Sequence, residues 1–243
     1  MLRRLFVFWY ACGLALMLTF GVPEWLSFSN GLFLVLFTCY ALSIERKLGE
    51  PAKVSGVRAG LVALVTFGLE SIGVATGYPF GAYQYSTILG LSVAGVPVAI
   101  ALAWVGIIAC AVMVVAVGSK WLRAGLVGGI ALILDLVLDP VAYARGFWLW
   151  EGDPSLGYYG VPAQNFISWF VIAALASFLY PIRPVPAPVR KEAGRLLQAL
   201  VLMFGLLGLR EGYVMPLAIA ACGALLMEGA FIRYAAGPQK RLV

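Results

Sequence analysis

The sequence predicts an all-α integral membrane protein with about eight transmembrane helices, which include two parallel copies of one helical hairpin, residues 58–104 and 123–169. Three observations lead to this fold class: an extreme apolar composition, the placement of the basic residues, and a repeat that recurs after 65 residues. Together they indicate a single transmembrane domain over residues 1–243.

The composition places the chain in a lipid bilayer. Of its 243 residues, 63% are hydrophobic and 12% are charged, and the mean hydropathy is +0.96, whereas a soluble domain carries about 25% charged residues. Crossing the hydrocarbon core takes about 20 apolar residues, and the apolar runs predict eight helices on that basis. They lie near 4–22, 28–44, 57–76, 95–117, 122–139, 165–181, 194–209 and 213–231.

The lysines and arginines predict how these helices are oriented. With the N-terminus inside, only Arg145 and Arg210 of the 17 basic residues fall in outer segments. An excess of basic residues on one side marks the cytoplasmic face. We therefore expect a multi-pass protein of the inner (cytoplasmic) membrane, with both termini in the cytoplasm and a proline-rich cytoplasmic linker over 182–194. This topology explains the net charge of +6, so we expect contacts with membrane lipids and no nucleic-acid partner.

Two stretches of the chain repeat each other without a gap. The sequence RAGLV at 58–62 recurs at 123–127, and GVP at 95–97 recurs at 160–162. In the same register the aligned pairs are Glu70 with Asp135, Tyr78 with Tyr143, Tyr83 with Trp148, Tyr85 with Trp150 and Trp104 with Trp169.

These matches define two repeat units, 58–117 and 123–181, each of which runs outward and returns. Parallel repeats of this kind are related by an axis along the membrane normal, and binding sites lie at the interface between such repeats. We therefore expect equivalent residues to face each other across a shared cavity. The alternative is that the repeat records only duplication and helix packing.

Three acids lie within the predicted spans: Glu70, Asp135 and Asp139. A carboxylate inside a span costs about 2.5–3.5 kcal/mol on insertion scales, so each is a candidate catalytic residue. Asp135 and Asp139 are four residues apart and share one helix face. Three acids packed away from water cannot all be ionised cheaply, so at least one is expected to stay protonated and to act as a general acid.

Other readings of the acids stay open. Asp139 could be a helix-end residue before Pro140 that pairs with Arg145. Acids near the ends of the spans are expected to be solvated, and these are Glu24, Glu45, Glu211 and Glu228.

The outer loops 76–90 and 139–166 are rich in aromatic residues. An interfacial aromatic belt would explain part of this enrichment. Its density beside buried acids also suits a long, flat, apolar ligand or a cation stabilised by ring faces. The predicted substrate-binding residues are Tyr78, Tyr83, Tyr85, Trp104, Tyr143, Arg145, Trp148, Trp150, Tyr159, Asn165 and Trp169.

The chain contains no histidine and no glycine-rich nucleotide motif. This composition excludes zinc sites of the HExxH type, Ser-His-Asp hydrolysis and P-loop nucleotide binding. We therefore expect no cofactor and no metal, with chemistry that depends on carboxylates, Tyr, Arg, Lys and Asn.

The combination of motifs resembles one known family. It consists of Glu70 followed by GYPFGAYQY, the Asp135 and Asp139-Pro140 pair, GFWLW at 146–150, and the two GVP segments that precede Trp104 and Trp169. These features resemble the membrane-bound carotenoid biosynthesis proteins of bacteria and haloarchaea, which are carotenoid 1,2-hydratases acting on γ-carotene, lycopene or bisanhydrobacterioruberin. The resemblance covers about residues 58–180.

The resemblance implies a cofactor-independent hydro-lyase that adds water across the terminal C-1,2 double bond of an acyclic carotenoid end group. The substrate would enter from the lipid bilayer, and a partnership with other carotenoid enzymes stays open. For this chemistry we expect Asp135 or Glu70 to protonate C-2 and the other to orient and deprotonate water. Tyr83, Tyr85, Trp148 and Trp150 would face the tertiary cation at C-1.

Three alternatives share some of these features. A carotene cyclase would use the same protonation, but an alkene of the chain itself would capture the cation. A transporter of a small apolar ligand would also carry acids near the middle of the membrane. A prenyltransferase is suggested by the spacing of Asp135 and Asp139, although this pair lies toward the outer side, away from cytosolic diphosphates.

Overall fold

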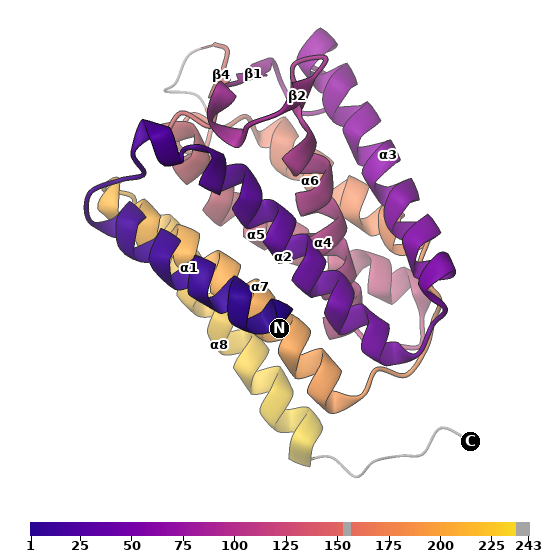
Figure 1. Cartoon of the computed structure of the whole chain (residues 1–243). Helices are drawn as coiled ribbons and strands as arrows, with labels where there is room; N and C mark the ends of the chain where they lie inside the picture. Colours follow the sequence, from indigo (N-terminus) through magenta and orange to yellow (C-terminus); the bar gives the residue numbers. More distant parts are fainter. Residues whose placement is uncertain (153–156, 237–243) are drawn as a thin grey trace.

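The chain is an all-α membrane protein whose helices form one bundle, seen in Figure 1 with short strands gathered at one end. The computed structural model describes residues 1–152 and 157–236. Loop residues 153–156, and Lys240 and Arg241 among the basic residues counted above, lie outside the described residues. The α-helices are α1 (Leu2–Leu18), α2 (Phe28–Glu45), α3 (Ala52–Thr76), α4 (Val98–Val114), α5 (Lys120–Ala144), α6 (Ala163–Ser177), α7 (Ala187–Arg210) and α8 (Val214–Ala236).

Within the described ranges, five helical segments are long and apolar enough to cross a membrane. They are Glu24–Leu48, Ala52–Thr76, Lys120–Ala144, Ala187–Arg210 and Val214–Ile232. The apolar helices α4 and α6 are shorter than the spans expected over 95–117 and 165–181. Helix α4 is apolar on all sides and buried over most of its length, which is the pattern of a helix at the centre of a bundle.

Two helix boundaries differ from the sequence prediction for reasons that involve proline. Helix α5 continues beyond Pro140 to Ala144, so Asp139 lies inside a helix and is not a helix-end residue. Helix α7 begins at Ala187, inside the segment expected to be a linker over 182–194. Proline is tolerated in the first turn of a helix, where its missing N–H has no intrahelical partner, and Pro188 occupies such a position.

Short strands and 3₁₀ turns fill the connections. Strand β1 (Tyr83–Tyr85), between α3 and α4, pairs antiparallel with β4 (Trp148–Trp150), between α5 and α6. The remaining elements are β2 (Ser92–Val93), which pairs with β3 (Val96–Pro97), and the turns η1 (Glu24–Leu26), η2 (Arg46–Leu48) and η3 (Thr87–Leu89). Figure 1 places β1 and β4 together above one end of the bundle, so loops far apart in sequence form one small sheet there.

The β1–β4 sheet relates the two repeats by an approximate two-fold axis. Gln84 lies opposite Leu149, and these residues are 65 positions apart, so each faces its own repeat equivalent. On either side the order reverses, because Tyr83 pairs with Trp150 and Tyr85 pairs with Trp148. A two-fold axis that passes between Gln84 and Leu149 produces this register.

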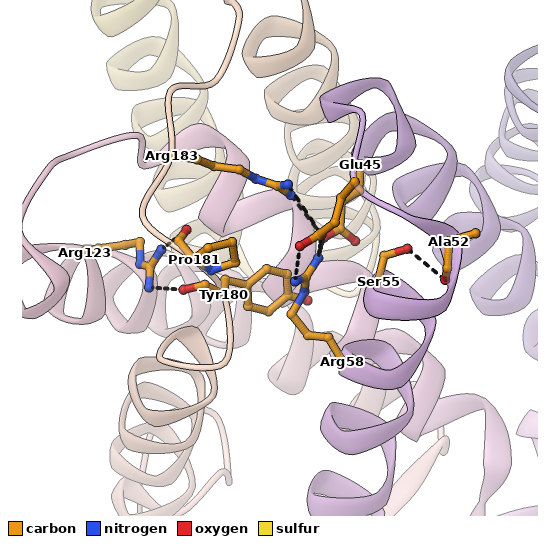
Figure 2. A network of polar contacts seen from close by, with 9 residues as sticks. Glu45, Ala52, Ser55, Arg58, Arg123, Tyr180, Pro181 and Arg183 are labelled. Atoms are coloured by element: carbon orange, nitrogen blue, oxygen red, sulfur yellow. Dashed lines mark hydrogen bonds and ion pairs between the residues drawn. The ribbon is translucent and has the colours of Figure 1, made fainter. Parts of the chain in front are cut away.

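The repeat arginines lie buried at the end of the bundle where α3 and α5 begin (Figure 2). Arg58 on α3 donates to Glu45 at 2.5 Å and to Glu50, and its guanidinium lies 4.6 Å from the ring centroid of Tyr180. The hydrogen bond from Arg58 holds the pKa of the Glu50 carboxyl below its usual range. The expectation that Glu45 is solvated was wrong, because Glu45 is 2% exposed and pairs with Arg58.

Arg123, the equivalent of Arg58, makes different contacts. Its guanidinium donates to three backbone carbonyls at the end of α6 and just beyond it, those of Ser177, Tyr180 and Pro181, at 2.7–2.9 Å. A cation near the C-terminal end of a helix interacts favourably with the helix dipole. Tyr180 therefore connects both arginines, since its ring lies against Arg58 and its carbonyl accepts from Arg123 (Figure 2).

Candidate active site

Glu70 lies on the buried face of α3 and accepts hydrogen bonds from three side chains. The hydroxyls of Tyr83 and Tyr85 donate to its Oε2 at 2.5 and 2.9 Å, and Nε1 of Trp104 on α4 donates to its Oε1 at 3.0 Å. Side chains alternate along a strand, so Tyr83 and Tyr85 point inward from β1 while Gln84 points outward, where it meets Glu151. Three donors on one carboxyl group stabilise its ionised form.

Asp135 and Asp139 form a second acidic group on α5. One amide group serves both, because Nδ2 of Asn165 donates to Asp135 at 2.9 Å and to Asp139 at 2.6 Å. All three side chains are at least 98% buried. Asn165 has only two N–H groups, so both are used. Two neighbouring carboxyl groups with so few donors hold a proton between them more readily than two negative charges.

The two acidic groups meet at a cavity of about 90 Å³. Glu70, Asp139 and Asn165 line it, whereas Asp135 is not among the lining residues. Aromatic rings form much of the remaining wall, and they belong to Phe33, Phe37, Phe80, Tyr83, Tyr85, Trp104, Phe147, Trp148, Trp150, Trp169 and Phe204. The β1–β4 sheet supplies four of these rings, and it lies at one end of the bundle (Figure 1).

The pairing of repeat equivalents is only partly symmetric. Trp104 and Trp169 stack with their centroids 4.1 Å apart, as an axis between the repeats predicts. Asp139 aligns with Val74 and Asn165 aligns with Ile100, so the second acid and its amide partner occur in one repeat only. The first repeat has tyrosines at 83 and 85, and the second repeat has tryptophans at the equivalent positions 148 and 150. The cavity therefore has one face with a carboxyl group that accepts three hydrogen bonds and another where one amide group serves two carboxyl groups.

Four of the predicted binding residues lie outside the cavity lining. Tyr78 is 71% exposed, and Tyr143 is not among the lining residues. Arg145 pairs with Glu211 at 2.7 Å and thereby joins the second loop to the end of α7. The ring of Tyr159 lies 4.3 Å from that of Tyr213. Because Arg145 forms its ion pair with Glu211, the alternative in which Arg145 pairs with Asp139 is wrong.

Other predicted residues do meet at the cavity. They are Glu70, Tyr83, Tyr85, Trp104, Asp139, Trp148, Trp150, Asn165 and Trp169. Glu70 was expected to face Asp135 across the cavity. Instead Asp139 lines the cavity together with Glu70, and Asp135 is not in the lining but shares the amide group of Asn165 with Asp139. Within the described residues, no three His, Cys, Asp or Glu side chains come close enough to hold one metal ion.

Sequence reasoning missed the part of the lining that comes from the terminal helices. Helix α1 contributes one residue, and α2 and α7 contribute several: Met17, Asn30, Phe33, Leu34, Phe37, Leu200, Met203 and Phe204. Asn30 was the one detectable signal, since a buried amide in an apolar helix is rare and marks a cavity or a polar partner. Phe80 and Phe147 were also missed, although both lie within the quoted loop motifs.

The fold and the site define a helical membrane protein with an aromatic-lined chamber where two separate acidic groups meet. Residues 30–229 match the family of carotenoid biosynthesis proteins, and the chain belongs to this family. The match begins in α2 and ends in α8, so it extends beyond the resemblance drawn over 58–180.

The chain is also similar to the bisanhydrobacterioruberin hydratase of Haloarcula japonica. The two are 31% identical over 170 residues, which is 65% of this chain and 56% of that relative. The matched region thus spans only a little over half the length of the relative. No solved structure matches the chain.

Proposed function

We propose that this protein is a carotenoid hydratase that adds water to the terminal C-1,2 double bond of an acyclic carotenoid end group. The observation that carries the proposal is that Glu70 and Asp139 line one aromatic-walled cavity in a chain of the carotenoid biosynthesis family. The hydratase named above supports the reaction type.

The Asp135–Asp139 pair supplies the proton in this mechanism. Asp139 faces the cavity and transfers its proton to C-2 of the end group, while Asp135 and Asn165 hold the carboxylate that remains. The π bond breaks, a C–H bond forms at C-2, and a tertiary cation develops at C-1. A positioned general acid contributes about 10²–10⁴-fold to such a step.

The chamber stabilises the cation and directs water to it. Ring faces of the aromatic wall attract a cation, and the Glu70 carboxylate adds a negative charge that three donors hold in place. Water forms the C–O bond at C-1 and releases a proton to Glu70. Proton exchange from Glu70 back to the aspartate pair restores the starting state, so alkene and water give a tertiary alcohol without an oxidant or reductant.

Expression in a host that makes lycopene or γ-carotene tests the proposal. We expect pigments that are heavier by one or two water molecules and more polar, and we expect Glu70→Gln and Asp139→Asn to abolish them at unchanged protein levels in the membrane. Glu211→Gln is the matched control, because this acid lies at the outer end of α7 and pairs with Arg145 away from the cavity. A pigment of altered absorption but unchanged mass would instead identify a cyclase.

A further inference from the structure

A second cavity lies along the seam between α1 and α7, toward the ends where these helices begin. Its volume is about 530 Å³, and it is open on one side. Its floor is apolar, with Phe6 and Val7 from α1 and Leu196 and Ala199 from α7. Charged residues lie toward its inner end, and these are Arg3, Lys191, Glu192 and Arg195. We call this second cavity the seam groove.

The linings of the seam groove and of the catalytic cavity adjoin on two helices. On α7, the groove lining reaches Ala199 and the cavity lining begins at Leu200. On α2, the groove includes Tyr40 and the cavity includes Phe37, one turn away. Lining residues therefore continue along α7 from Pro188 to Phe204, and 16 residues of helix correspond to about 24 Å.

Phe6 of the groove lining also lies against rings of the catalytic cavity. The ring of Phe6 lies 5.5 Å from that of Tyr40 in the groove, and 5.7 and 6.4 Å from those of Phe33 and Phe37 in the catalytic cavity. The hydroxyl of Tyr10, one turn further along α1, donates to the carbonyl of Ala199 at 3.0 Å across the same seam. Phe6, which is 4% exposed, therefore lies where the two linings adjoin.

The size of the proposed substrate requires an exit from the catalytic cavity. A cavity of about 90 Å³ holds the end group that reacts but not a rigid C40 polyene, whose length is comparable to the hydrocarbon core of a bilayer, about 30 Å. The remainder of the chain must leave along an apolar path. Helices α1, α2 and α7 contribute only uncharged residues to the cavity lining, and the same three helices line the seam groove.

We propose that the seam groove binds the distal half of the carotenoid, with Phe6 as the side chain that turns aside to admit it. This inference rests on the hydratase function proposed above. The apolar floor covers the polyene, and the charged groups at the inner end mark where the groove meets the membrane surface. In this arrangement the carotenoid lies roughly along α7, with its reacting end at Asp139 and its other end beside Lys191 and Glu192.

Bulky substitutions in the groove, assayed with two substrates, test this placement. Val7→Trp and Ala199→Trp fill the groove but lie outside the catalytic cavity. With purified protein in lipid nanodiscs, we expect each to slow hydration of lycopene by about tenfold or more, because misplacing a reacting group by 1 Å can cost about 10²-fold. Hydration of an acyclic apolycopenoid, shortened at its far end, should stay within about twofold of the wild type.

The shortened substrate also reports on folding, since its normal turnover shows an intact active site. Leu64→Trp and Leu225→Trp are matched controls, because both leucines are 70% exposed and line neither cavity. The inference is wrong if both groove variants hydrate lycopene at the normal rate, which is the result expected if the groove held only a phospholipid chain. It is also wrong if the variants hydrate lycopene and the shortened substrate with equal losses of rate. Should Ala199→Trp be absent from membranes, Val7→Trp decides alone, because Val7 is half exposed. Wild-type protein that hydrates neither substrate would contradict the hydratase function itself.

Discussion

Trp104 and Trp169 occupy equivalent positions in the two repeats, and their indole rings stack across the repeat interface with centroids 4.1 Å apart. Their chemical environments differ, because Trp104 donates to Glu70 and Trp169 makes no hydrogen bond of this kind in the described part of the chain. The repeat therefore brings two identical side chains together, and only one of them has a carboxylate partner in the described part of the chain.

This difference predicts unequal effects of the same substitution. Trp104→Phe removes a donor to a charged group, and such hydrogen bonds contribute about 1.5–3 kcal/mol, so we expect hydration to slow by about 10- to 100-fold. Trp169→Phe keeps an aromatic ring and should slow it by less than about threefold. Rates of lycopene hydration by the two purified variants test the assignment, and equal losses would show that stacking is what matters.

The two aspartates should also differ. Asp139 lines the cavity and Asp135 lies behind it, so Asp139→Asn removes the proton donor and should cost at least about 10²-fold. Asp135→Asn retains a group that can share a hydrogen bond with Asn165, and we expect a smaller loss. Single-turnover rates with both variants measure the order, and a larger loss for Asp135→Asn would reverse the roles.

Substitutions of Tyr83 and Tyr85 test whether their hydrogen bonds stabilise the ionised carboxylate of Glu70. Tyr83→Phe and Tyr85→Phe keep the ring and remove one hydroxyl each, so each should lower the hydration rate by about tenfold. The two hydroxyls bond to the same oxygen, and the double variant should therefore deviate from additivity. Strict additivity in the double-mutant cycle would mean that the hydroxyls act independently.

The ion pair between Glu50 and Arg58, near the start of α3, predicts how stability depends on pH. The folded-state pKa of its carboxyl is lowered by Arg58, so its contribution to stability is fully present above the unfolded-state pKa of about 4.3 and is lost as pH falls through the folded value. Thermal unfolding of detergent-solubilised wild type and Glu50→Gln should differ near pH 6, and the difference should shrink as the pH falls below the unfolded-state pKa and vanish below the folded-state pKa. A difference that persists at low pH would exclude Glu50 ionisation as its cause.

The sequence was informative wherever polarity contrasted with an apolar background. Glu70, Asp135, Asp139 and Asn165 stood out for that reason, and the repeat predicted that the first two would converge. The sequence could not show which aspartate faces the cavity, because residues four apart share a helix face and their depth behind it depends on packing.

The contribution of the terminal helices could not be predicted for a different physical reason. A helix that faces lipid and one that lines an apolar cavity need the same residues, so Phe33, Leu200 and Phe204 carry no distinguishing pattern. Glu45 was misjudged because its partner Arg58 is 13 residues away and belongs to the next helix. Pro140 was read as a helix end, although a single proline removes only one hydrogen bond and α5 continues past it.

Isotope labelling tests the central claim most directly. Membranes that contain the protein would be supplied with lycopene in buffer made from heavy water, and separately in water labelled with a heavy oxygen isotope. Water addition by Asp139 and Glu70 predicts a product with one deuterium at C-2 and one labelled oxygen at C-1 for each hydrated end, and no product from Asp139→Asn. Deuterium without labelled oxygen in a product of unchanged formula, or full hydration by Asp139→Asn, would contradict the account.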